Sequence, residues 1–187
     1  MNVWGCRTML GYDRNGLGYK RQGRGNNVPC TIILPKIAIE NGICLGTREE
    51  PDLDGFWKDL DRALRICEQA LLERYAIIKK QSPKAAPFMY QNNTIQGARD
   101  CSETVEDAVK HGTLGMGFIG IAEMCQALFG KSHDEDPEVH KFALSVVEHI
   151  YDYAKDAGDR TNLNFACYAT PKLSVGAYTV MCNEKIA

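Results

Sequence analysis

The segment Thr113-Leu-Gly-Met-Gly-Phe-Ile-Gly120, followed by Ile121-Ala-Glu-Met-Cys-Gln-Ala-Leu-Phe129, decides the fold class. Its first half is a short apolar run that predicts a buried strand over 113–117. Its second half predicts a helix that ends at Gly130. Glycines at the junction allow a strand and the helix after it to pack closely. The segment therefore indicates a strand–turn–helix unit.

Elements on either side of this unit extend it to an α/β pattern. Further strands are predicted at 28–34, 86–90 and 163–168. Helices are predicted at 36–40, 54–80, 103–110 and 136–158. The 54–80 helix has the clearest apolar face, formed by Phe56, Trp57, Leu60, Leu64, Cys67, Leu71, Tyr75 and Ile78. Strands that alternate with helices are typical of an α/β domain.

Composition narrows the class of protein. The chain has 187 residues, a formal net charge of −2 and 25% charged residues, which favours a single folded domain. No apolar run approaches the roughly 18 residues of a membrane span, and the amino terminus lacks the features of a signal peptide. The balanced charge gives no reason to expect binding to DNA or to a membrane surface. We therefore expect a cytoplasmic protein.

The cysteines are expected to be reduced thiols, and one of them, Cys6, is expected to be reactive. Eight cysteines occur at positions 6, 30, 44, 67, 101, 125, 167 and 182. No Cys-x-x-Cys pair is present, so the sequence predicts no zinc site, and the expected compartment keeps thiols reduced. Cys67 and Cys125 lie on apolar helix faces and are expected to be buried. Cys6 differs, because Gly5 and Arg7 flank a thiol that an open loop would expose.

Residues 1–28 are glycine-rich and basic, which predicts a loop or hairpin tip, with a flexible terminal segment as the alternative. The histidines are isolated. His111 follows the predicted 103–110 helix and is interpreted as a carboxyl-terminal cation or polar cap of that helix. It has no second ligand at metal-binding spacing.

Gly115-Met-Gly117-Phe-Ile-Gly120 matches the G-x-G-x-x-G pattern of dinucleotide-binding proteins. That pattern requires a full strand before the glycines and an acidic residue about twenty positions later, at a strand end. Asp136 and Glu138 lie instead in a polar loop and a helix start. Two other interpretations remain: a tight turn for close packing, or a helix amino terminus that receives a phosphate or oxyanion.

Several ordered motifs together resemble one family. They are Met-Asn-Val-Trp-Gly5-Cys6-Arg7-Thr8, Gly23-Arg-Gly-Asn26, Thr31-Ile-Ile-Leu-Pro-Lys-Ile-Ala-Ile-Glu40, His111 to Glu123, and Asn164-Phe-Ala-Cys-Tyr-Ala-Thr170-Pro171. In this order they are similar to the central region of the anaerobic (class III) ribonucleoside-triphosphate reductases, which are glycyl radical enzymes. The resemblance runs from residue 5 to residue 171 almost without gaps.

The resemblance implies a fold and a division of the chain. We expect a partial segment of a ten-stranded α/β barrel, with residues 1–171 as the central part of the reductase barrel and 1–28 as its radical-cysteine loop. Residues 172–187 are expected to be a divergent tail, because Lys172-Leu173 stands where the family has Ala-Glu.

The resemblance also implies a reaction, the reduction of ribonucleoside triphosphates to 2′-deoxyribonucleoside triphosphates for DNA synthesis. Cys6 matches the cysteine that becomes a thiyl radical, and Asn26 matches an active-site asparagine. Gly117, Gly120 and Thr170 are assigned to substrate binding. A glycyl radical formed by a separate radical S-adenosylmethionine activating enzyme, formate as reductant, nucleoside triphosphate effectors bound elsewhere, and a homodimer are implied; no metal is expected in this chain.

The family's chains are several times longer than 187 residues. The sequence has no counterpart of their amino-terminal regulatory region, second active-site cysteine, zinc-binding cysteine pairs or glycyl-radical loop. We therefore expect a fragment that is inactive alone. The alternatives are a split-gene or remnant subunit that needs complementation by other segments and, less favoured, a dinucleotide-binding domain.

Overall fold

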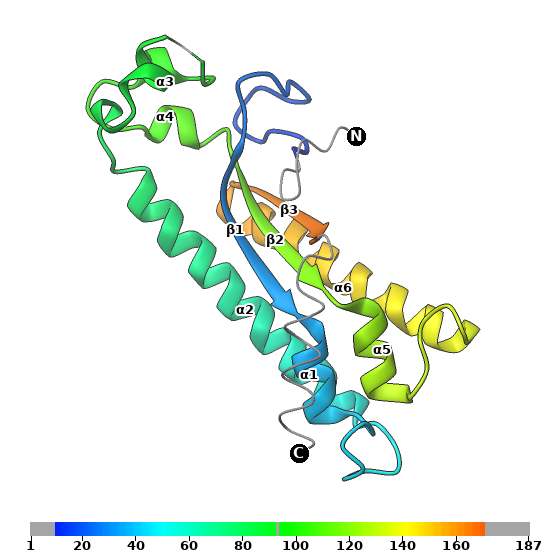
Figure 1. Cartoon of the computed structure of the whole chain (residues 1–187). Coiled ribbons are helices and arrows are strands. Elements are labelled where there is room, and N and C mark those ends of the chain that lie inside the picture. The colour runs from blue at the N-terminus through cyan, green and yellow to red at the C-terminus, as the bar shows by residue number, and fades with distance from the viewer. Residues whose placement is uncertain (1–9, 93, 171–187) are drawn as a thin grey trace.

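The computed structural model describes residues 10–92 and 94–170, so Cys6 and the 172–187 tail lie outside the described residues. Its sheet contains the strands β1 (Asn26–Ile33), β2 (Thr113–Ile119) and β3 (Asn164–Ala169). All pairs are parallel and the order is β1-β2-β3, with β2 in the centre (Figure 1). The strands predicted at 28–34, 113–117 and 163–168 are therefore confirmed, and so is the α/β class.

The segments between the strands are mainly helical. The longer ones are α1 (Leu34–Asn41), α2 (Leu53–Ile78), α5 (Ile121–Phe129) and α6 (Pro137–Thr161). The shorter ones are α3 (Pro87–Gln91), α4 (Glu106–Val109) and the 3₁₀ turns η1 (Pro83–Ala85) and η2 (Ala98–Asp100). Within the described part of the chain, no helix has the length and apolarity needed to cross a membrane.

The two long helices begin at side-chain caps. Asp52 accepts a hydrogen bond from the Gly55 amide at 2.8 Å at the start of α2. Asp136 accepts one from the Glu138 amide at 2.9 Å, and Pro137 is the first residue of α6. Such caps satisfy amide groups that have no partner inside the helix.

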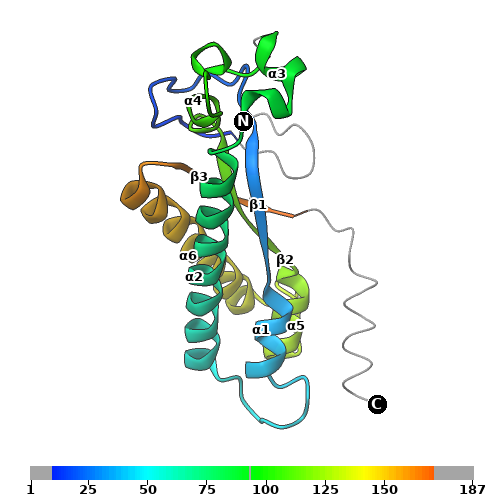
Figure 2. The same ribbon diagram turned by 90° about the vertical axis from the view of Figure 1, so that its left-hand side faces the viewer.

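Helices α2 and α6 lie on the same side of the sheet (Figure 2), where α2 packs against β1 and α6 against β3. The residues of β2 that point to this side are buried, namely Leu114, Met116 and Phe118. They join a core that includes Phe56, Leu60, Leu64, Cys67, Leu71, Val146 and Ile150. The apolar core therefore lies on the α2 and α6 side of the sheet, and the opposite face is not part of it.

Two local predictions are wrong. Residues 86–90 do not form a strand, because Pro87 begins the helix α3 and the Tyr90 amide bonds to the Ala86 carbonyl at 3.3 Å. Proline has a fixed φ that suits the first turn of a helix, and this outweighs the strand preference of the aromatic residues after it. The 103–110 helix is also shorter than predicted, since α4 covers Glu106–Val109 alone.

Candidate active site

The face of the sheet that points away from α2 and α6 carries small and polar residues along most of its length, with Ile33 and Ile119 at the carboxyl ends of β1 and β2. Alternate residues of a strand point to opposite sides, so Gly115 and Gly117 face away from the core residue Met116. The register places Thr31 of β1 and Tyr168 of β3 on either side of Gly117. We call Thr31, Gly115, Gly117, Tyr168 and Thr170 the glycine face.

The buried Tyr168 ring lies against the two glycines of β2. A Cβ atom at Gly115 would lie 2.7 Å from Tyr168 Cε1, and one at Gly117 would lie 2.9 Å from Tyr168 Cζ. Both distances are shorter than van der Waals contact between carbon atoms. The ring therefore takes this position only because residues 115 and 117 have no side chain.

Gly117 and Thr170, two of the predicted substrate-binding residues, lie together. A Cβ atom at Gly117 would lie 2.9 Å from Thr170 Oγ1. Thr170 continues the β3 pairing, since its amide donates to the Phe118 carbonyl at 2.8 Å. Its hydroxyl lies 3.3 Å from the Thr31 hydroxyl. This pair of hydroxyls can rotate to donate to, or accept from, a hydroxyl group of a ligand.

Gly120, the third predicted substrate-binding residue, lies just beyond β2 at the start of α5. Its φ of 84° is in the left-handed region, which glycine adopts at little cost, and Pro35 occupies the space where a side chain would be. Because β2 extends to Ile119, Gly115 and Gly117 lie inside the strand and not in a turn after it. The dinucleotide fingerprint places its glycines in that turn, so close packing is the interpretation that fits.

Asn26 lies at the amino end of the sheet. It pairs with Thr113, which in turn pairs with Asn164, so the three strands begin with a row of polar residues. The Thr113 hydroxyl is buried and has no hydrogen-bond partner among the described residues. Gly117 lies four residue steps along β2 from Thr113, a length on the order of 13 Å. The structure thus places Asn26 away from Gly117 and Thr170.

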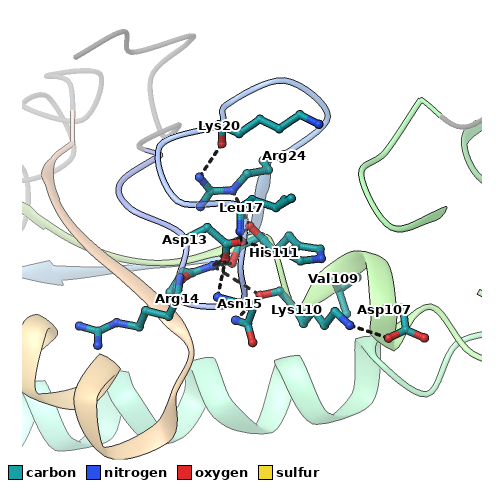
Figure 3. Close-up of polar contacts among 12 residues, drawn as sticks. Asp13, Arg14, Asn15, Leu17, Lys20, Arg24, Asp107, Val109, Lys110 and His111 are labelled. Carbon is teal, nitrogen blue, oxygen red and sulfur yellow. Dashed lines mark hydrogen bonds and ion pairs between the residues drawn. The ribbon is translucent and has the colours of Figure 1, made fainter. Parts of the chain in front are cut away.

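A buried carboxylate connects the loop before β1 to the same end of the sheet. Asp13 is 1% exposed, and its carboxylate accepts hydrogen bonds from Asn164 Nδ2 at 2.6 Å and from the Leu17 amide at 3.0 Å. His111 Nδ1 lies 2.9 Å from Asp13 Oδ2, the oxygen that also accepts from the Leu17 amide, whereas Asn164 donates to Oδ1 (Figure 3). We call Asp13, His111 and Asn164 the loop anchor.

The loop anchor favours the charged form of Asp13. Burial opposes ionisation, but the hydrogen bonds from Asn164, His111 and two backbone amides outweigh it and hold the pKa of Asp13 below its usual value. An ionised carboxylate is an acceptor only, so His111 Nδ1 carries the hydrogen in this contact. The loop is therefore held by charge-assisted hydrogen bonds, which are stronger than neutral ones.

Arg24 adds a second set of contacts inside this loop (Figure 3). Its Nε donates to the His111 carbonyl at 2.8 Å, and its Nη1 donates to the carbonyls of Gly11 and Lys20, each at 2.9 Å. The loop also contains an isolated antiparallel bridge between Asp13 and Gly18, which agrees with the predicted hairpin tip. The arginine of the Gly23-Arg-Gly-Asn26 motif thus holds the loop in shape.

Sequence reasoning missed several of these residues. Nothing in the local sequence marks Asp13 or Asn164, because they contact each other across 151 positions of the chain. His111 follows α4 as predicted, but its contact with Asp13 has no sequence signal. Tyr168 was recognisable only as a strand residue. Among residues 10–92 and 94–170, no group of three or more His, Cys, Asp or Glu side chains is arranged to hold a metal ion.

Comparisons with known proteins agree with one another. A family model described as anaerobic ribonucleoside-triphosphate reductase matches residues 1–185. The anaerobic ribonucleoside-triphosphate reductase of Salmonella typhimurium is 30% identical over 171 residues, which cover 89% of this chain and 23% of that protein. The chain therefore spans about a quarter of the length of this relative.

Two solved structures from Thermotoga maritima have a similar fold. The anaerobic ribonucleotide reductase with citrate in the active site is 16% identical, with a TM-score of 0.60, and covers 89% of this chain and 30% of that one. The complex of the same enzyme with dATP and CTP is 16% identical, with a TM-score of 0.52, and covers 79% and 24% of the two chains. At these identities the likeness concerns the fold.

Proposed function

Because the chain belongs to the anaerobic ribonucleoside-triphosphate reductase family, we propose that it is the segment of the catalytic barrel that carries the radical cysteine and part of the nucleotide site. In the assembled enzyme it would contribute to the reduction of ribonucleoside triphosphates to 2′-deoxyribonucleoside triphosphates. As 187 residues alone it would not turn over.

The composition of the glycine face carries this proposal. The Thr31 and Thr170 hydroxyls lie 3.3 Å apart beside Gly117. Asn26 and the Thr113 hydroxyl lie farther along the sheet, at the amino ends of β1 and β2. A ribose offers hydroxyls that both donate and accept, which are suitable partners for amides and threonines. The Tyr168 ring covers Gly115 and Gly117, so the hydroxyls of Thr31 and Thr170 are the groups of this face that we assign to a ligand.

In the proposed reaction, Cys6 in its thiyl state takes the 3′-hydrogen atom of the ribose. The 2′-hydroxyl then takes up a proton from solution and leaves as water, while formate supplies two electrons and the second proton and is oxidised to carbon dioxide. The chemistry that a glycyl radical supplies is removal of the hydrogen atom from the Cys6 thiol; the resemblance places that radical on another segment, so no residue here is assigned to hold it. Asn26 would hydrogen-bond to the reacting part of the ribose.

The loop anchor supports the assignment of residues 1–28 as the radical-cysteine loop. A radical site must be held in place and kept from water. Asp13 lies seven positions after Cys6 and is fixed to β3 through Asn164, while Arg24 ties the other end of the loop to the His111 carbonyl. The chain that continues to Cys6 therefore starts from a rigid base.

We propose the same partners that the resemblance implies. The Thermotoga maritima enzyme has been crystallised with dATP and CTP, which supports nucleoside triphosphates as substrate and as effectors, the latter bound outside this segment. The remaining reductase segments, the radical S-adenosylmethionine activating enzyme and a second copy of the assembled enzyme complete the proposal. We place the reaction in the cytoplasm.

A chimera tests the function. The matching 171-residue segment of the Salmonella typhimurium reductase is replaced by this chain, and the chimera is activated anaerobically with its activating enzyme. We expect formation of dCTP from CTP that depends on formate. Cys6→Ala should abolish it, whereas Cys44→Ser, at an exposed position, should not. Retained dCTP formation in a well-folded Cys6→Ala chimera would contradict the proposal.

The alternative of a subunit that needs complementation is tested with separate polypeptides. The chain and the two flanking segments of the Salmonella typhimurium reductase are purified apart and mixed. Co-elution in size-exclusion chromatography together with restored turnover would identify a split enzyme. Turnover by the 187-residue chain alone would contradict both interpretations.

A further inference from the structure

A groove of about 570 Å³ lies between the outer strand β1 and the helix α2. The residues that line it come from β1, α1 and α2 and include Cys30, Ile32, Lys36, Arg62, Ile66 and Cys67. Cys30 pairs with the core residue Met116, so its side chain points to the helix-covered side of the sheet, and Thr31 of the glycine face also lines the groove. The function proposed above uses neither Cys30 nor Cys67.

Two of the lining residues are cysteines in contact with each other. Cys30 is half-buried, Cys67 is 2% exposed, and their thiols share a hydrogen bond. The bond joins a strand to the helix that covers it, and both partners face a cavity large enough to admit small molecules. The hydrogen bond places the two sulfur atoms close together, and the half-buried Cys30 is the more accessible of the two.

The two thiols are electrostatically unequal. The hydrogen bond from Cys67, with a contribution from the Arg74 cation, outweighs burial and lowers the pKa of Cys30 to about 6. The same hydrogen bond together with burial raises the pKa of Cys67. By contrast, burial raises the pKa of Cys125 and of Cys167 to about 11. These opposite shifts favour the thiolate at Cys30 and the neutral thiol at Cys67. The thiolate is the nucleophilic form of a cysteine.

We propose that Cys30 and Cys67 form a peroxide-responsive modification site, at which a reversible disulfide ties β1 to α2. The Cys30 sulfur attacks one oxygen of hydrogen peroxide, the O–O bond breaks, and the leaving hydroxide takes a proton to become water. The Cys67 sulfur then attacks the resulting sulfenic acid, the S–O bond breaks, and a second water leaves. Two thiols lose two electrons, and one peroxide becomes two waters. A small dithiol reverses the step.

The bond would change the stability of the chain. A disulfide between Cys30 and Cys67 closes the loop of residues 31–66 and so restricts the unfolded chain more than the folded one. The outer strand would then be covalently joined to the helix that covers it. Oxidation should therefore make the sheet harder to unfold and should close one side of the groove.

The test uses the 187-residue chain, reduced and then treated with one equivalent of hydrogen peroxide. We expect the intact mass to fall by two hydrogen atoms, a peptide map without reductant to link Cys30 to Cys67, and the urea midpoint of unfolding to rise. Dithiothreitol should restore the starting mass and midpoint. In Cys30→Ser and Cys67→Ser the mass loss and the shift should be absent, whereas Cys44→Ser should behave as the parent chain.

Three results would overturn the proposal. They are a link that involves other cysteines, a gain of oxygen without a link, and the same loss of mass in Cys30→Ser. Far-ultraviolet circular dichroism of each variant, recorded before oxidation, shows whether it is folded. If both serine variants are unfolded, the linked peptide in the parent chain decides the question, because its presence supports the site and its absence refutes it.

Discussion

The two faces of β2 differ although they alternate along the same seven residues. On one face Leu114, Met116 and Phe118 pack into the core beneath α2 and α6. On the other face Gly115 and Gly117 leave space that the Tyr168 ring occupies. The first face stabilises the fold through buried apolar volume, and the second requires the absence of side chains. Neighbouring residues of β2 therefore serve different purposes: one packs the core, and the next faces the proposed substrate side of the sheet.

The largest effect is expected on the core face. Met116 is fully buried, so Met116→Ala should lower the free energy of unfolding by about 2–5 kcal/mol through lost burial and the cavity it leaves. Urea unfolding of the chain measures this loss. The matched control is Met89→Ala in α3, where the side chain is 46% exposed and the expected change is within about 0.5 kcal/mol. Equal losses at both positions would mean that the two methionines do not differ in burial as described.

The next effect concerns the loop anchor. Asp13→Asn keeps the size of the side chain but places an amide group against the donors of His111 and Asn164, so one buried group loses its partner. We expect a loss of about 1–3 kcal/mol in urea unfolding. Asp159→Asn is the control, because its ion pair with Arg14 is exposed and should be worth less than about 1 kcal/mol. A neutral Asp13→Asn would show that the anchor does not hold the loop.

The contribution of Asp13 should also depend on pH. Its pKa is lowered in the folded chain relative to the unfolded value near 3.9, so the carboxylate stabilises the fold above that value and loses this effect as pH falls through the folded pKa. The difference in stability between the parent chain and Asp13→Asn should therefore be full at pH 7 and should shrink below about pH 4. A difference that stays constant down to pH 2 would contradict the lowered pKa.

The smallest effect on stability is expected on the glycine face. Gly117→Ala places a Cβ atom 2.9 Å from both Thr170 Oγ1 and Tyr168 Cζ, and we expect a loss of about 1 kcal/mol from overpacking. In the Salmonella typhimurium chimera, dCTP formation should fall by more than this loss explains, because the substrate side of the sheet is changed. Gly11→Ala, where no atom lies within 4 Å, is the control for both measurements.

Sequence patterns predicted the parts of the molecule that depend on local order. The spacing of Phe56, Leu60 and Leu64 was sufficient to predict α2, and a helix predicted from residue 136 agrees with α6, which Asp136 caps. The resemblance marked Gly117 and Thr170, which the fold brings together. The loop anchor escaped prediction because its hydrogen bonds join residues that only the folded chain brings close. Residues 86–90 were misread because an aromatic run after a proline satisfies strand and helix signals alike.

Strand β1 begins with a bulge between Asn26 and Val28, next to the loop that precedes it. Asn26 pairs with Thr113 and Val28 with Leu114, so Asn27 is an extra residue that turns Asn26 to the side opposite Val28. Its side chain donates to the Val109 carbonyl at 2.6 Å, which holds the extra residue in place. Deleting Asn27 would leave Asn26 and Val28 on opposite sides but shorten the connection to the loop by about 3 Å. One residue thus sets the length of the connection between β1 and the loop of residues 10–25, independently of every side chain on the glycine face.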